Sequence, residues 1–228
     1  MPAGHEPVRP GRVLAVAHRA GNDLEALAAA TAAGADVLED DVHRYRGRLE
    51  VRHSKALRPL PYLWDAGEPL VSTRVPRLLL PAVLDALSSD ATLMLDLKGP
   101  GAVGRHVARA VHHQLPERPL LVCSRWWPGV DAVAGLPWAR PLLTARNRAE
   151  LLRLRRRVRG GRRPYGVSLH RSLLTPSVVA ELRERVELVL TWGVDDEATL
   201  DDVLARGVNG VISDSADVLA QVKALSRR

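Results

Sequence analysis

Short apolar runs alternate with amphipathic segments along this 228-residue chain. Eight of the runs are almost continuously apolar, a pattern typical of parallel strands that are covered by helices. The predicted strands span residues 13–17, 37–42, 93–97, 120–123, 141–144, 165–169, 188–192 and 210–213. Between them apolar residues recur at helical spacing, as Leu24, Leu27 and Ala28 do. Thr175 followed by Pro176 predicts another helix start, with a capping hydroxyl before a first-turn proline.

Eight strands that alternate with helices favour a closed (β/α)8 barrel, the TIM barrel. Such barrels typically need about 250 residues and at least about 200, so we expect a compact version with little or no insertion subdomain. An open, doubly wound sheet is the alternative. It is disfavoured because no glycine-rich loop follows the first predicted strand. We expect a single domain over residues 1–228, with residues 1–11 flexible.

Composition sets the class of protein. The chain carries 33 Lys and Arg against 26 Asp and Glu, a formal charge of +7, and 46% of its residues are hydrophobic. These proportions are ordinary for a folded protein. No apolar stretch reaches the ~20 residues of a membrane span, the N-terminus lacks the apolar core of a signal peptide, and the lone Cys123 cannot form an internal disulfide. We therefore expect a cytoplasmic protein, and the oligomeric state is left open.

The most basic segment is residues 146–163, which holds nine arginines. Its leucines, Leu151, Leu152 and Leu154, can pack on one side with the guanidinium groups outside. The segment has no aromatic residue on which bases could stack, so no nucleic-acid partner is expected. Weak contact with an anionic membrane surface is the alternative that the charge leaves open.

Polar side chains gather at the ends of the first three predicted barrel strands. Glu39 and Asp41 are two residues apart on one strand and therefore share a face, as do Asp96 and Lys98 on the next. The carboxyl ends of barrel strands meet at one mouth, where carboxylates repel each other unless a cation intervenes. Oxygen ligands suit a hard divalent ion, Mg²⁺ or Ca²⁺. The alternative is that one of the acids merely caps a helix or pairs with an arginine.

Two histidines are expected at the same mouth. His18 follows the first strand directly. Residues 44–51 read as a tight hairpin that turns at Arg46 and Gly47, which returns His53 toward the mouth. Two imidazoles beside a metal can act as base and acid near neutral pH.

Further candidates surround these two histidines. Arg19 and Lys98 are cations suited to binding a phosphate. Trp192, His170 and Ser124 lie near predicted strand ends and are candidates for the substrate pocket, against the alternative that they are core or structural residues.

The order of these motifs resembles the glycerophosphodiester phosphodiesterases, which share a TIM barrel with phosphatidylinositol phospholipase C and spider sphingomyelinase D. The matching segments are His18-Arg19-Ala20 for His-Arg-Gly, Glu39-Asp40-Asp41 for Glu-x-Asp, His53-Ser54 for His-Asp, Asp96-Leu97-Lys98 for the third acid and lysine, and the stretches 190–195 and 207–214 for the last two strands. The resemblance runs from His18 to Asp217. Ala20 replaces a glycine, Ser54 replaces an aspartate, and the loop after Gly21 is shortened so that its glutamate is missing.

The resemblance implies an enzyme that cleaves a small-molecule phosphodiester to glycerol phosphate and an alcohol. It implies one divalent cation, Mg²⁺ or Ca²⁺, on Glu39, Asp41 and Asp96. His18 is expected to act as base and His53 as acid, with Arg19 and Lys98 on the phosphate. The alternatives are a phosphodiesterase like lysophospholipase D or sphingomyelinase D, or a catalytically impaired barrel that only binds phosphate.

Overall fold

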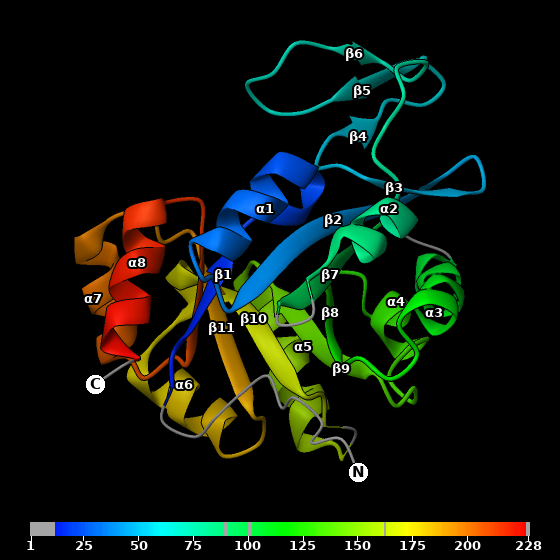
Figure 1. The fold of residues 1–228 in the computed structure, drawn as a ribbon. Coiled ribbons are helices and arrows are strands. Elements are labelled where there is room, and N and C mark those ends of the chain that lie inside the picture. Colours follow the sequence, from blue (N-terminus) through cyan, green and yellow to red (C-terminus); the bar gives the residue numbers. More distant parts are fainter. Residues whose placement is uncertain (1–11, 89–90, 100–101, 162, 227–228) are drawn as a thin grey trace.

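Eight parallel strands form a closed barrel at the centre of the molecule (Figure 1). The computed structural model describes residues 12–88, 91–99, 102–161 and 163–226. The barrel strands are β1 (Leu14–Ala17), β2 (Val37–Tyr45), β7 (Thr92–Lys98), β8 (Leu120–Ser124), β9 (Ala139–Ala145), β10 (Gly166–His170), β11 (Leu188–Trp192) and β12 (Gly210–Ser213). Strand β1 pairs in parallel with both β2 and β12, which closes the ring. The predicted barrel is confirmed and the open sheet is wrong. The prediction for residues 1–11 falls outside the described residues.

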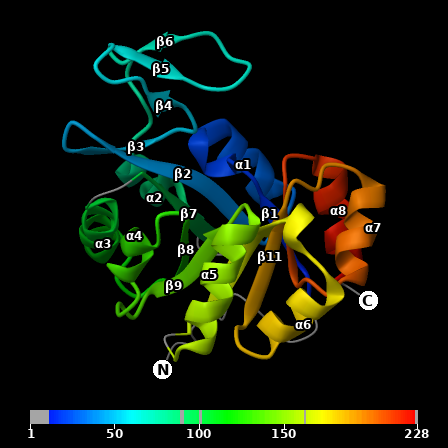
Figure 2. The same cartoon turned by 180° about the vertical axis from the view of Figure 1, so that it is seen from behind.

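Helices cover the outside of the barrel (Figures 1 and 2). They are α1 (Leu24–Ala32), α2 (Leu80–Ala86), α3 (Val103–Gln114), α4 (Trp127–Asp131), α5 (Arg148–Arg159), α6 (Pro176–Arg183), α7 (Glu197–Ala205) and α8 (Ala216–Leu225), with short 3-10 turns η1 (Ala20–Asn22) and η2 (Arg171–Leu173). The Thr175 side chain accepts a hydrogen bond from the N–H of Val178, so the predicted start of α6 is confirmed. No helix of the described residues is long and apolar enough to cross a membrane.

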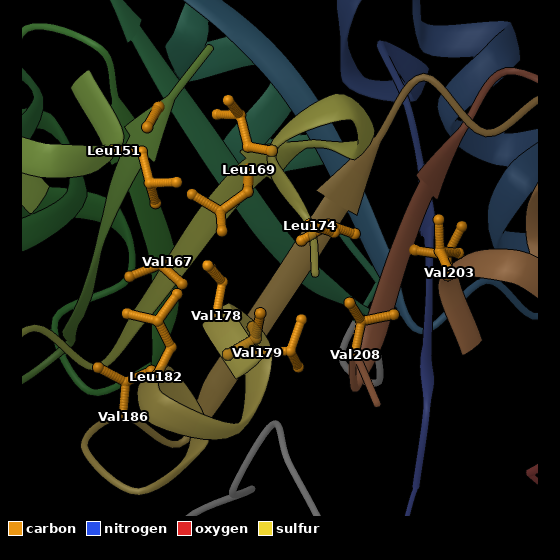
Figure 3. Close-up of a cluster of buried hydrophobic side chains, with 14 of the residues drawn as sticks. Leu151, Val167, Leu169, Leu174, Val178, Val179, Leu182, Val186, Val203 and Val208 are labelled. Atoms are coloured by element: carbon orange, nitrogen blue, oxygen red, sulfur yellow. The ribbon is translucent and has the colours of Figure 1, made fainter. Parts of the chain in front are cut away.

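Alternating strand residues divide the apolar core between the inside and the outside of the barrel. One buried cluster comprises Leu14, Val16, Val37, Met94, Leu121, Cys123, Leu142, Leu188, Leu190 and Ile212, which are alternate residues of the barrel strands and fill its interior. Outside, strand residues such as Leu169 pack against helix residues such as Val179 (Figure 3). Because apolar side chains fill the interior along the strands, the inward positions at the strand ends are left for polar groups.

Strand β2 runs past the barrel into the predicted hairpin. It pairs in antiparallel fashion with β3 (Arg48–Val51), with Tyr45 opposite Arg48. The two turn residues, Arg46 and Gly47, both have positive φ (47° and 83°). A two-residue turn of this kind matches the twist of the paired strands, and glycine adopts it at little cost.

The segment after β3 forms a small antiparallel sheet of β4 (Lys55–Ala56), β5 (Tyr62–Trp64) and β6 (Val71–Ser72), which projects from the barrel beyond the β2–β3 hairpin (Figure 1). The chain length predicted little or no insertion subdomain. The insertion is indeed small, and it forms a three-stranded sheet of its own. Much of its apolar surface is exposed, on Leu60, Tyr62, Trp64, Leu70, Val71 and Val75.

The arginine-rich segment forms α5 and pairs with its neighbours. Arg155 and Arg159 both contact Glu181 of α6, and Arg157 contacts Asp131 of α4. Leu151 and Leu154 are buried as predicted, whereas Leu152 is 50% exposed, so its predicted place on the packed side is wrong. Several of the guanidinium groups thus have protein partners.

Candidate active site

Three carboxylates converge at the end of the barrel where the strands finish. Glu39 and Asp41 lie on the same side of β2, and Asp96 on β7 stands opposite Asp41 in the parallel register. Glu39 is 3% and Asp41 0% exposed. One oxygen from each of the three lies within 4.8 Å of the others. Oxygens bound to one Mg²⁺ or Ca²⁺ at about 2.0–2.6 Å can be at most about 5 Å apart, so the spacing fits such an ion.

The charge of the cluster also fits a divalent cation. The Lys98 Nζ lies 2.6 Å from Asp41 Oδ1 and also pairs with Asp96. Burial alone would lower the pKa of Lys98, but Asp96, Asp41 and Glu39 raise it well above its usual value, so the ammonium stays charged. One ammonium among three ionised carboxylates leaves two negative charges without compensation. All three candidate metal ligands are carboxylate oxygens, the ligand type that a hard cation prefers.

The pKa values of the three carboxylates reflect this excess of negative charge and their burial. Burial and the neighbouring Asp41 raise the pKa of Glu39 well above its usual value, and burial also raises the pKa of Asp96. Burial would raise the pKa of Asp41 too, but Lys98 and the hydrogen bond from Asn22 bring it below its ordinary value. Buried carboxylates that favour protonation are those that gain most from a bound cation.

Backbone and amide groups hold the carboxylates in place. Asn22 Nδ2 donates to Asp41 Oδ2 at 2.8 Å, and its Oδ1 accepts from the Asp41 N–H at 2.8 Å. The Arg19 N–H donates to Glu39 Oε2 at 2.7 Å. Arg19 adopts a left-handed conformation (φ 56°), which turns the chain sharply after β1.

His18 is bonded to a carboxylate from the far end of the chain. Its Nδ1 donates to Asp214 Oδ2 at 2.9 Å, and Asp214 follows β12 directly. Its Nε2 lies 4.0 Å from Glu39 Oε2. The bond between His18 and Asp214 depends on barrel closure, because Asp214 follows β12 and β12 is the strand that pairs with β1. The ring therefore presents Nε2 to the carboxylate cluster.

His53 has the same arrangement with different partners. Its Nδ1 donates to Asp65 Oδ2 at 2.6 Å, and its Nε2 lies 2.9 Å from Arg19 Nη2. A guanidinium only donates, so Nε2 carries the lone pair and Nδ1 the proton. The structure thus gathers His18, His53, Arg19, Lys98 and the carboxylate cluster at one mouth.

The three pocket candidates differ in position. His170 and Trp192 end adjacent strands and contact each other edge to face, with ring centroids 4.6 Å apart. Burial and the nearby Arg171 and Arg146 lower the pKa of His170. Ser124 is buried, and its hydroxyl donates to Leu97 O and accepts from the Trp126 N–H. Ser124 is therefore committed to the backbone, and its predicted contact with substrate has no support in the structure.

Sequence reasoning missed three residues of this site, namely Asn22, Asp65 and Asp214. Asp214 could have been found, because it follows a barrel strand as the other site residues do. Asn22 lies in the short turn after β1 and carries no distinctive sequence pattern. Asp65 lies in the insertion, and no sequence signal links it to His53.

Comparison with known proteins adds a structural likeness. Neither the models of known families nor the curated proteins gave a match to this sequence. Among solved structures, a protein of Silicibacter pomeroyi assigned to the glycerophosphoryl diester phosphodiesterases is similar at a TM-score of 0.74 and 20% identity, over 94% of each chain. An Oleispira antarctica phosphodiesterase in complex with the product sn-glycerol-3-phosphate is similar at 0.72 and 18% identity, over 95% of this chain and 97% of that one.

A glycerophosphodiester phosphodiesterase from Thermotoga maritima is similar at a TM-score of 0.70 and 18% identity, over 94% of this chain and all of that one. These likenesses span nearly the whole chain and establish that it has the barrel fold found in glycerophosphodiester phosphodiesterases of known structure. At 18–20% identity, the fold is what these proteins share with this chain.

Proposed function

We propose that this protein is an enzyme that hydrolyses glycerophosphodiesters to glycerol phosphate and an alcohol. The observation that carries the proposal is that His18 and His53, each bonded through Nδ1 to a carboxylate, stand beside a cluster of three buried carboxylates. Bonding through Nδ1 turns the Nε2 of each ring toward the site, near Glu39 for His18 and against Arg19 for His53, and a substrate oxygen that takes these places can exchange a proton with Nε2. The barrel shared with known phosphodiesterases supports the same reaction.

The residues divide the reaction between them. Bound to Glu39, Asp41 and Asp96, one Mg²⁺ or Ca²⁺ would offset the negative charge that develops on a phosphate oxygen. Arg19 and Lys98 contact the other phosphate oxygens. These five side chains fix the phosphate at the mouth of the barrel.

Two proton transfers complete the mechanism. His18 accepts a proton from the attacking hydroxyl, which belongs either to water or to a neighbouring substrate group that forms a cyclic phosphate. His53 donates a proton to the departing alcohol oxygen. The paired rings of Trp192 and His170 pack against the alcohol group of the small-molecule substrate.

A second candidate is a phosphodiesterase of the lysophospholipase D or sphingomyelinase D kind. It is favoured by one observation, the exposed apolar side chains of the insertion. Trp64, which is 43% exposed, directly precedes Asp65, the partner of His53. An acyl chain bound there would lie next to the catalytic histidine, and its burial would contribute to binding.

The decisive experiment is to incubate the purified protein with Mg²⁺ or Ca²⁺ and a panel of glycerophosphodiesters and lysophospholipids, and to follow products by phosphorus NMR. Release of glycerol phosphate is expected, and it should disappear in Glu39→Gln. Preference for the lysophospholipids would favour the second candidate. Phosphate binding without any product would instead indicate an impaired barrel and overturn the proposal.

A further inference from the structure

The inserted sheet delivers a carboxylate to His53. Strand β4 begins two residues after His53, and in its antiparallel pairing Lys55 stands opposite Trp64 of β5. Continuing that register by one position brings the end of β5 back beside the residues that precede β4. The register sets Asp65, the residue after β5, opposite Ser54, and its side chain reaches the neighbouring His53, to which it is bonded at 2.6 Å.

The carboxylate of Asp65 is itself fixed. Its Oδ1 accepts a hydrogen bond from the N–H of Ala66 at 2.9 Å, which leaves Oδ2 for the imidazole. Its side chain is 21% exposed and that of His53 is 32% exposed, so the pair is only partly open to water. The residue after His53 is Ser54, which brings no charge, and the guanidinium of the preceding Arg52 pairs with Glu50. Among the described residues, Asp65 is the carboxylate bonded to this ring.

Of the other charged groups around His53, some favour a positive charge on the ring and some oppose it. Arg19, which follows β1, lies against Nε2, and Asp41 and His43 of β2 are close enough to interact electrostatically with the ring. Arg19 opposes a positive ring, whereas Asp65 stabilises one and also fixes which nitrogen carries the proton when the ring is neutral. Without Asp65, no carboxylate bonded to the His53 ring would offset the positive charge of the Arg19 guanidinium among the described residues.

We propose that Asp65 is the positioning residue of His53. The sheet β4–β6 would then contribute directly to catalysis by holding Asp65 against that histidine. The inference rests on the proposed function, in which His53 is the general acid. Asp65 holds the ring with Nδ1 protonated and Nε2 directed to the departing oxygen, and it keeps the imidazolium available as the proton donor.

The test compares Asp65→Asn and Asp65→Glu with Glu68→Gln, an exposed carboxylate on the same insertion. Two substrates are used: glycerophosphocholine, whose alcohol is a poor leaving group, and bis(p-nitrophenyl) phosphate, whose phenolate leaves without an acid. Asp65→Asn should lower kcat for glycerophosphocholine by about 10²-fold, the low end of the range for acid catalysis, with little change in KM. Activity on the nitrophenyl ester should fall far less, Asp65→Glu should recover part of the loss, and Glu68→Gln should match wild type.

The pH profile gives a second readout. Asp65→Asn removes the negative charge bonded to the His53 ring, so the alkaline limb of the kcat/KM profile should move to lower pH. Equal losses on both substrates, with the alkaline limb unmoved, would show that Asp65 only supports the fold and would overturn the inference.

Nitrogen-15 NMR of the histidine rings separates this inference from the proposed function. Wild-type His53 should show the Nδ1-protonated form, and Asp65→Asn should change both its tautomer balance and its titration. A His53 signal that Asp65→Asn leaves untouched would disprove the pairing even if the enzyme is active. A clear change in a protein that hydrolyses neither substrate would support the pairing while rejecting the proposed function.

Discussion

Asn22 and Asp41 are joined by two hydrogen bonds, in which the amide Nδ2 donates to the carboxylate and the amide oxygen accepts from the Asp41 N–H, both at 2.8 Å. This pair connects the turn after β1 to the middle of β2. It orients the Asp41 carboxylate, and the hydrogen bond from Nδ2 occupies one lone pair of Asp41 Oδ2. The amide therefore decides which lone pairs of Asp41 face the cluster.

Replacing this amide should weaken cation binding. In Asn22→Ala the Asp41 carboxylate loses its orienting partner, and groups that orient metal ligands typically contribute about 10- to 100-fold to affinity. Titration calorimetry with Mg²⁺ and with Ca²⁺ measures the loss. Glu25→Gln, an exposed change in the adjacent helix α1, is the control and should bind like wild type. Unaltered affinity in Asn22→Ala would contradict a cation site at Asp41.

Cation removal should affect stability as well as turnover. A cation that binds only the folded protein stabilises it by about 2.7 kcal/mol at one hundred times its dissociation constant. Added Mg²⁺ or Ca²⁺ should therefore raise the melting temperature of chelator-treated protein, and Glu39→Gln should abolish the rise. Turnover that is indifferent to EDTA would count against metal dependence.

The two histidines should each be essential to turnover. His18→Ala and His53→Ala should each lower kcat by about 10²–10⁴-fold, because each removes one proton transfer. His112→Ala, an exposed change on α3, should be neutral. Initial rates on a glycerophosphodiester provide the measurement, and a double variant as active as wild type would refute the assignment.

Asp40 should make the protein less stable as the pH rises. It lies on the outer side of β2, fully buried, and neither of its oxygens has a hydrogen-bond partner among the described residues. Burial, followed by repulsion from Asp41 and Asp96, raises the pKa of Asp40 well above its usual value. The stability from this group is thus complete below the unfolded pKa of about 3.9 and is lost as the pH climbs through the folded pKa.

Asp40→Asn should reveal this cost. At pH 7 the free energy of unfolding should increase by on the order of 1–3 kcal/mol, because the amide is neutral without taking up a proton and is not repelled by Asp41 and Asp96, and the gain should shrink toward pH 4. Urea denaturation in the presence of chelator at several pH values checks the trend. Asp201→Asn on the exposed face of α7 should give no pH-dependent gain. A gain that grows as the pH falls would reverse the sign and reject the explanation.

The sequence predicted the barrel well because its strands are short, nearly continuous apolar runs separated by helical patterns, and successive strand residues point to opposite faces. The same alternation placed Glu39 with Asp41 and Asp96 with Lys98. It could also have excluded Ser124, since the interior cluster contains Leu121 and Cys123 of β8 and the next residue falls out of phase.

The insertion could not be predicted in the same way. Strands β4, β5 and β6 contain only two or three residues each, too few to show a period. The antiparallel pairing of β4 and β5 brings Asp65 near His53, and that pairing is a property of the folded chain. Leu63 is the buried large apolar side chain of these three strands, and one such residue is too little to mark a structured element in the sequence.

The contact between His18 and Asp214 spans 196 positions of the chain. Synthesis proceeds from the N-terminus, so His18 is made early and waits for its partner until the last barrel strand has left the ribosome and docked beside the first. A nascent or prematurely terminated chain, even one that had collapsed around most of its strands, would lack this bond. The His18–Asp214 bond therefore forms only after β12 has been made and has paired with β1.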